Sequence, residues 1–240
     1  MSQGLLPYTV ETVPGGDTVT SRAGLPLVLE TLRALGLPRA IREHVHVRER
    51  QSGYTETEKI EALVLLLAAG GDCLDASAIL QADGGLGRLL DRQLPSADTL
   101  RHFLYACHDG QLIAAAQAQR PAGQVADLPA ENAALQGLAR VNTALVQQVA
   151  AQGKSTTATL DHDATIQESH KREALPHYKG GRGYQPTAVY WVEQDLVVAD
   201  EVPGRERGRR DAYLAAHPAG LRQPAGHGDH LRLPGGHRLL

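Results

Sequence analysis

Two aspartates lie two residues apart in the apolar, β-branched stretch at residues 156–166. In an extended strand side chains alternate between two faces, so Asp161, Asp163 and Thr165 point one way. The other face then carries the remaining side chains, Leu160, His162, Ala164 and Ile166. Two carboxylates on one face offer the hard oxygen ligands that Mg²⁺ prefers, and this ion leaves its other positions to water and phosphate. The stretch therefore predicts phosphoryl-transfer chemistry on nucleic acid.

A basic, glycine-rich segment follows within twenty residues of this pair. Its cations are Lys171, Arg172, Lys179 and Arg182, and its glycines are Gly180, Gly181 and Gly183. Glycine lets a main chain approach a phosphate closely, so we expect the four cations to contact a nucleic-acid backbone. The alternative is a solvated loop whose charges keep an edge strand from aggregating.

The two segments together resemble a known family. D-H-D-A-T followed by K-G-G-R-G-Y-Q-P is similar to the first-aspartate region of bacterial insertion-sequence transposases of the DDE type. The resemblance extends through the upstream helices, from about Ser21 to Val202. It implies an RNase H-like core in which three acidic residues hold two metal ions, Mg²⁺ or Mn²⁺. It also implies that Asp163 is the first of these acids, with Asp161 second in preference because it shares the face.

The same resemblance implies partners and a place of action. Such transposases cut and join DNA at the terminal inverted repeats of a transposon, as paired subunits, so we expect DNA binding, a homo-oligomer and a cytoplasmic, nucleoid-associated protein. The chain departs from the family in its later acids. Past Asp195 these are Asp200, Glu201, Glu206, Asp211 and Asp229, and none lies in a sequence resembling the later motifs. The triad is thus incomplete, and we expect no activity from the chain alone.

Helical patterns fill the region before these motifs. Pro26 suits a helix start, and a stripe of apolar residues follows until Gly36 and Pro38 stop it. Thr55 and Glu58 form a capping box ahead of a second helix that the glycine pair at 70–71 ends. A third helix begins with Ser96 as N-cap and buries Leu100, Phe103, Leu104 and Cys107. A fourth, at about residues 130–152, buries Leu135, Leu138, Val141, Leu145 and Val149.

The pattern changes to strands at residue 153. Residues 156–166, 187–192 and 196–202 predict three strands in series, with Glu193-Gln194-Asp195 as a tight connection between the last two. The fold class is therefore α+β, with a helical region leading into the first strands of an RNase H-like core. We expect a hairpin at residues 1–20, a helical and possibly DNA-binding region at 21–152, and the start of the catalytic domain at 153–202.

Residues 203–240 follow no helical or strand period and contain no Lys, Ile, Val, Thr or Ser. They read as the product of a frameshift in GC-rich DNA, or as a natural disordered basic tail. The chain is thus expected to be a transposase truncated or frameshifted after about residue 202.

Composition limits the other classes of function. The formal net charge of −3 does not mark a nucleic-acid binder, but three of the four lysines fall between Lys154 and Lys179, and a local patch is enough to contact phosphates. The two cysteines stand alone and the histidines lack zinc-ligand spacing, which argues against disulfides and zinc. No apolar run approaches the ~20 residues of a membrane span.

Three alternatives remain open. The chain is a non-catalytic DNA-binding or regulatory protein, a hydrolase whose Asp161 and Asp163 form an acid–base pair, or an interaction protein built on amphipathic helices. The helix after Ser96 also permits a helix-turn-helix with Arg101 and His102 in the groove. That region is not basic, so plain scaffold is the favoured interpretation.

Overall fold

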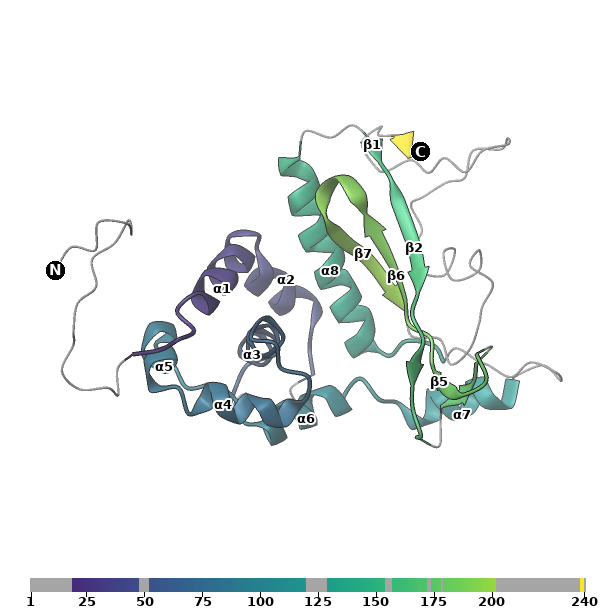
Figure 1. The fold of residues 1–240 in the computed structure, drawn as a ribbon, viewed down its shortest axis with the longest axis horizontal. Coiled ribbons are helices and arrows are strands. Elements are labelled where there is room, and N and C mark those ends of the chain that lie inside the picture. Colours follow the sequence, from purple (N-terminus) through teal and green to yellow (C-terminus); the bar gives the residue numbers. More distant parts are fainter. Residues whose placement is uncertain are drawn as a thin grey trace. The chain divides into compact units, whose positions relative to one another are not determined.

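The computed structural model describes residues 19–47, 52–119, 129–153, 157–171, 174–177, 179–201 and 238–239. These divide into two compact units (Figure 1). The first comprises residues 1–34 and 48–105, and the second residues 35–47 and 106–240. The hairpin expected at residues 1–20 and nearly all of the expected irregular tail lie outside the described residues.

The first unit is helical. Its helices are α1 (Leu25–Ala34), α3 (Glu56–Ala68), α4 (Ser77–Gln81), α5 (Gly84–Leu90) and α6 (Ala97–Tyr105), with a short 3₁₀ turn η2 (Leu74–Ala76) before α4. Leucines from all five helices and from Leu94 form one core, in which Leu29, Leu65, Leu86 and Leu100 are fully buried. The apolar stripes in the sequence therefore face one another.

Local signals set the ends of these helices as the sequence predicts. The Thr55 hydroxyl accepts from the Glu58 amide, and the Glu58 carboxylate accepts from the Thr55 amide, which completes the capping box of α3. Gly70, with φ +80°, follows the end of that helix. The Ser96 hydroxyl accepts from the Thr99 amide at the start of α6. Leu104 and Cys107 are exceptions: Leu104 is 39% exposed where burial was expected, and Cys107 is half-buried and lies beyond the end of α6.

A buried carboxylate ties three segments of the first unit together. Glu61 on α3 is 1% exposed, and its two oxygens accept from Nε and Nη2 of Arg33 on α1 at 2.8 and 3.0 Å. It also accepts from Arg92, in the connection between α5 and α6. Burial raises the pKa of Glu61, but the hydrogen bonds from Arg33 and Arg92 lower this pKa by more. The net pKa of Glu61 is therefore below its ordinary value. The carboxylate is therefore ionised and paired.

The second unit combines helices with two small sheets. Its helices are α2 (Leu37–His44), α7 (Gly110–Gln119) and α8 (Ala133–Gln152). Helix α2 was not expected: Gly36, with φ +88°, ends the preceding helix as predicted, but Pro38 then occupies the first turn of a new one. A side chain at Gly137 of α8 would meet the His44 carbonyl at 2.3 Å, so only glycine allows α2 and α8 to pack this closely.

The larger sheet has the strand order β2–β6–β7, all antiparallel. Its strands are β2 (Leu160–Ala164), β6 (Thr187–Trp191) and β7 (Leu196–Glu201), and the 3₁₀ turn η3 (Val192–Gln194) joins the last two. The three predicted strands and their connection are thus confirmed, except that the first is divided by Thr159. The piece before the break, β1 (Thr157–Ala158), pairs in parallel with β8 (Arg238–Leu239).

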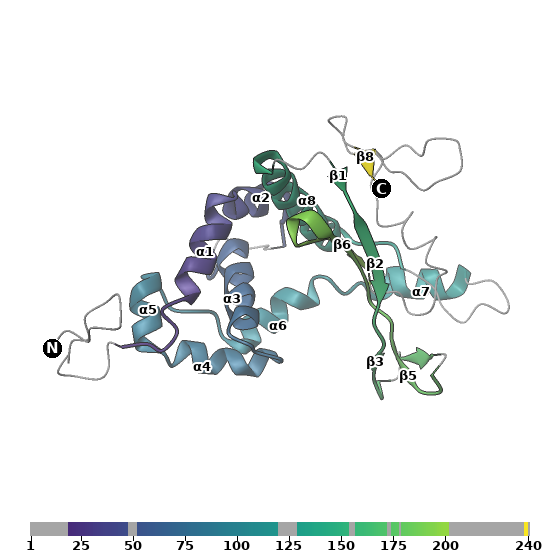
Figure 2. The ribbon, with the colours of Figure 1, turned by 45° about the horizontal axis from the view of Figure 1, so that its top comes forward.

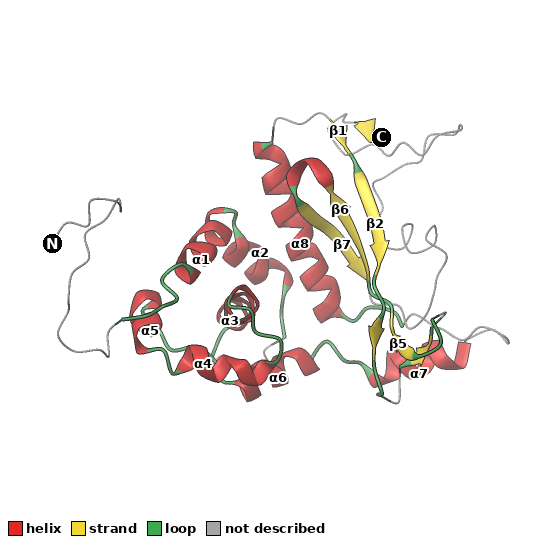
Figure 3. Ribbon diagram, viewed as in Figure 1, coloured by secondary structure: helices red, strands yellow, loops and turns green. Residues whose placement is uncertain are grey.

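Helix α8 runs along one face of this sheet (Figures 1 and 3). Val146 and Ala150 pack with the buried residues Ala158 and Trp191, and Asn142 donates to the Val198 carbonyl at 3.1 Å. The predicted α8 begins three residues later than expected, after Asn132, whose side chain accepts from the Leu135 amide. Of its five expected core residues, Val141 is buried and Leu135 is 38% exposed, because Gly137 rather than Leu135 faces α2.

We predict that Glu61→Gln destabilises the first unit by about 3–5 kcal/mol, because it leaves two guanidinium groups beside a neutral amide in the core. Urea unfolding followed by circular dichroism measures this. The matched control is Glu30→Gln, which removes an exposed partner of the same Arg33 and should change stability by about 0.5 kcal/mol or less.

The pH dependence of the same unit has a defined sign. The folded pKa of Glu61 is depressed, so its ionic contribution is present above the unfolded pKa and is lost as pH falls through the folded pKa. Wild type should lose more stability on acidification than Glu61→Gln. Equal slopes for the two proteins would contradict this account.

Candidate metal centre and nucleic-acid interface

Asp161 and Asp163 lie together on the uncovered face of β2. Exposure along the strand alternates as predicted: both aspartates are exposed, whereas Leu160, His162 and Ala164 are half-buried on the side of α8. Alternation gives each aspartate a neighbour across the sheet, because Asp161 lies opposite Tyr190 and Asp163 opposite Ala188. The structure thus confirms that the two carboxylates share one solvent-facing side.

A third aspartate lies on the same face, although the sequence pattern gave it no role. Asp200 of β7 is opposite Ala188, which in turn is opposite Asp163. Two strand spacings separate Asp163 from Asp200, or roughly 10 Å between their Cα atoms. Asp200 is thus a more distant neighbour of Asp163 than Asp161 is, and no group of three metal-ligating side chains lies together among the described residues.

Two sets of side-chain hydrogen bonds stabilise the end of the sheet where the chain enters β2. Glu193 accepts from the Thr159 amide at 2.8 Å and from the Thr159 hydroxyl at 2.6 Å. These bonds from Thr159 lower the pKa of Glu193. Tyr190 donates to Asp195, which raises the pKa of the Tyr190 phenol. Sequence reasoning placed Glu193 and Asp195 in a tight connection, and the structure adds that both side chains brace the strands around it.

We expected the basic segment to be a loop, but it forms a second small sheet. Its strands are β3 (Gln167–Glu168), β4 (Leu175–Pro176) and β5 (Arg182–Tyr184), in the order β3–β5–β4. A Cβ on Gly183 would meet the Gln167 carbonyl oxygen at 2.3 Å, so glycine is required where β5 packs against β3. The sequence did not predict these strands, because each is only two or three residues long and the glycines and prolines around them favour turns.

The small sheet continues the ladder of the larger one (Figure 2). β2 pairs with β6 and β3 pairs with β5 in one common register, with no residue inserted between the two stretches. The Thr165 amide donates to the Pro186 carbonyl at 2.9 Å between them. The ladder therefore runs from Leu160 to Glu168 on one side. By strict alternation, Arg182 belongs to the same face of this ladder as Asp161 and Asp163.

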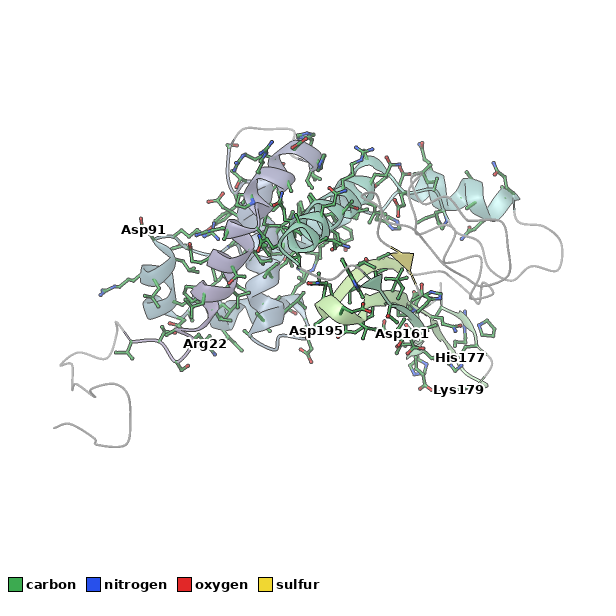
Figure 4. The ribbon with its side chains drawn as sticks, turned by 90° about the horizontal axis from the view of Figure 1, so that it is seen from above. Arg22, Asp91, Asp161, His177, Lys179 and Asp195 are labelled. Carbon is green, nitrogen blue, oxygen red and sulfur yellow. The ribbon has the colours of Figure 1, made fainter. Side chains whose placement is uncertain are left out.

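Three of the four predicted cations can be placed on this small sheet. Lys171 is exposed in the connection between β3 and β4, and Lys179 is exposed in the turn between β4 and β5. Arg182 is exposed on β5, and its Nε donates to the Ala174 carbonyl at 2.9 Å. Arg172 lies outside the described residues. Figure 4 labels Asp161 on the sheet and Lys179 beside His177 in the turn.

The helical unit offers less to a nucleic acid. Arg101, one of the two residues considered for groove contacts, pairs with Asp98 and Asp75. Both carboxylates are exposed, so this is a neutralised surface network. Scaffold therefore stays the favoured interpretation of α6. No helix among the described residues is both long enough and apolar enough to cross a bilayer.

Comparison with known proteins identifies a family. The sequence profile described as transposase DDE domain group 1 matches residues 7–218. The matched region contains both aspartates and the whole basic sheet, and it runs past Val202, where the resemblance in the sequence was thought to fade. Neither the curated proteins nor the solved structures gave a significant match.

We predict that Glu193→Gln loosens the junction between β1 and β2, because it replaces one of the two carboxylate oxygens that accept from Thr159 with an NH₂ group, which cannot accept. Amide hydrogen exchange at Thr159 should accelerate in the variant. Because the folded pKa of Glu193 is depressed, wild-type protection at Thr159 should also fall as pH drops through that pKa, and the variant should lack this dependence. Glu168→Gln, an exposed change on β3, is the control. Unchanged exchange at Thr159 would contradict the bracing role.

Proposed function

Because the chain belongs to the DDE transposase family, we propose that it supplies the first acidic strand of a transposase active centre, with Asp163 as the principal metal ligand and Asp161 beside it. The family membership supports a transposase-type function and DNA as the partner. The observation that carries the finer proposal is that both aspartates are exposed on one face of β2. The covered face, beneath α8, holds no such pair.

Asp161 and Asp163 can supply part of the coordination shell of one divalent ion. Mg²⁺ typically takes one or two protein carboxylates and completes its shell with water and phosphate oxygens, and Asp161 and Asp163 provide that number on an exposed surface. We propose Mg²⁺, or Mn²⁺ in its place. Such an ion, when bound, activates a water or a 3′-hydroxyl for in-line displacement at phosphorus. The aspartates themselves hold the ion, and the exposed face admits the DNA backbone.

The basic sheet supplies the complementary charge. We propose that Lys171, Arg172, Lys179 and Arg182 provide the positive charge that attracts the DNA backbone near the aspartates. Along the shared ladder, Asp163 and Arg182 are about six residues apart, or roughly 20 Å. Cations at that distance hold DNA by its phosphates without competing with the aspartates for the metal. The transposon's terminal inverted repeats, a homo-oligomer and action at the nucleoid in the cytoplasm follow as parts of the same proposal.

We further propose that this chain alone does not catalyse strand cleavage or transfer. Two-metal chemistry needs acids from more than one place in the fold, and the described residues bring no third ligand to Asp161 and Asp163. The same observation favours a second candidate function, a non-catalytic DNA-binding or regulatory protein.

We predict that Asp163→Asn weakens Mn²⁺ binding about tenfold or more, because it removes one of two anionic ligands near a dication. Electron paramagnetic resonance of free Mn²⁺ in a titration of the full chain measures this. Asp200→Asn is the matched control: it removes an equal charge from the same face, two strands away, and should have little effect.

Equal Mn²⁺ affinity for wild type and Asp163→Asn would refute the metal site and leave the DNA-binding candidate. Catalysis is tested separately with supercoiled plasmid and Mn²⁺. Wild type should leave the plasmid intact, and nicking that Asp163→Asn abolishes would show that the chain is active after all.

A further inference from the structure

Arg182 of the basic sheet makes hydrogen bonds to residues before and after Lys171. The Arg182 carbonyl accepts from the Ser169 amide at 2.9 Å, and the Arg182 Nε donates to the Ala174 carbonyl at 2.9 Å. Ser169 and Ala174 bracket Lys171 in the connection between β3 and β4. The connection is therefore attached to the central strand β5 at both of its ends by Arg182.

The second attachment is the one that depends on the side chain. Ala174 is fully buried, and its amide donates to the Lys171 carbonyl at 3.1 Å, which closes a turn. Arg182 thus holds Ala174, the donor end of this hydrogen bond, by the carbonyl of the same residue. Through that bond the Lys171 backbone is tied to β5, and the exposed Lys171 side chain projects from a fixed point of the main chain.

The turn that carries Lys179 is held by different bonds. The His177 amide donates to the Gly181 carbonyl, and the Gly180 amide donates to the His177 carbonyl, each at 3.0 Å. Gly180 has φ +90°, and the His177 ring packs on Gly181, where a Cβ would lie 2.8 Å from Nε2. These are backbone bonds and a glycine contact, whereas the backbone near Lys171 is held by the Arg182 side chain, so the main chain around the two lysines is held by different bonds.

We propose that Arg182 is a positioning residue of the DNA-binding surface: its guanidinium locks the β3–β4 connection so that Lys171 meets the DNA backbone, and its own charge is secondary. This inference rests on the proposed DNA contacts of the basic sheet and refines the role given there to Arg182. Lysine cannot replace it, because the lysine side chain has a methylene where arginine has the Nε donor.

The test is a double-mutant cycle in the full chain, with a fluorescent duplex oligonucleotide of arbitrary sequence as the probe. Binding is measured by anisotropy over a series of salt concentrations. The variants are Arg182→Lys and Lys171→Ala, alone and together. Arg182→Lys with Lys179→Ala forms the matched control cycle, because the backbone of the Lys179 turn is held by the bonds between His177, Gly180 and Gly181.

Lys171→Ala should lower the slope of log affinity against log salt by about 0.9, the value for one lost phosphate contact. Arg182→Lys should cause a similar loss of affinity and slope although it keeps the charge, and the double variant should lose no more than either single one. With Lys179→Ala the losses should multiply. Amide exchange should accelerate at Ala174, and not at Gly180, in Arg182→Lys.

The outcomes separate this inference from the proposed function. If Arg182→Lys binds as wild type, or if its loss multiplies with that of Lys171→Ala, Arg182 is not a positioning residue. If Lys171→Ala and Lys179→Ala both leave binding unchanged, or if wild type does not bind the duplex, the proposed DNA surface is wrong and the inference falls with it.

Discussion

A single antiparallel register governs the second unit. Leu160 to Ala164 and then Gln167 to Glu168 pair with residues 191 to 187 and 184 to 183, and no residue is inserted between the two stretches. Because strand side chains alternate, this register decides which residues α8 covers and which face solvent. A slip of β2 by one residue would bury Asp161 and Asp163 and expose Leu160, His162 and Ala164. The chemistry proposed for the surface therefore depends on backbone pairing more than on any side-chain contact.

The same ladder places opposite charges at its two ends. The aspartates lie on the part that α8 supports, where packing against Trp191 makes the backbone firm. The described cations Lys171, Lys179 and Arg182 lie on the narrow extension, which is held by hydrogen bonds and by the close approach of the backbone at Gly183. A rigid acidic end suits metal ligands, whose geometry must be fixed. A less tightly packed basic end suits contacts with a nucleic-acid backbone, since phosphate contacts tolerate small changes in side-chain position.

Much of this arrangement was predictable from periodicity. Alternation in residues 160–166 predicted the exposed aspartates, and the capping box at Thr55 predicted the start of α3, because both signals are local. The missed features depend on tertiary contacts. Helix α2 was hidden because Pro38 both stops and starts a helix. Gly183 and Arg182 looked like parts of a phosphate-binding loop, and only the pairing of β5 with two other strands shows why each is needed. Asp200 could be read from the sequence as an acid, but its place in line with Ala188 and Asp163 depends on strand pairing.

The buried carboxylate of Glu61 has an evolutionary consequence. Loss of Glu61 alone leaves two guanidinium groups without their buried partner, and loss of both Arg33 and Arg92 leaves the buried carboxylate unpaired, whereas simultaneous replacement of all three by apolar residues is often neutral or stabilising. Divergence at these positions must therefore pass through compensated steps. In an alignment of relatives they should covary as a set of three, present together or absent together, even though they are separated by up to 59 positions in sequence (from Arg33 to Arg92).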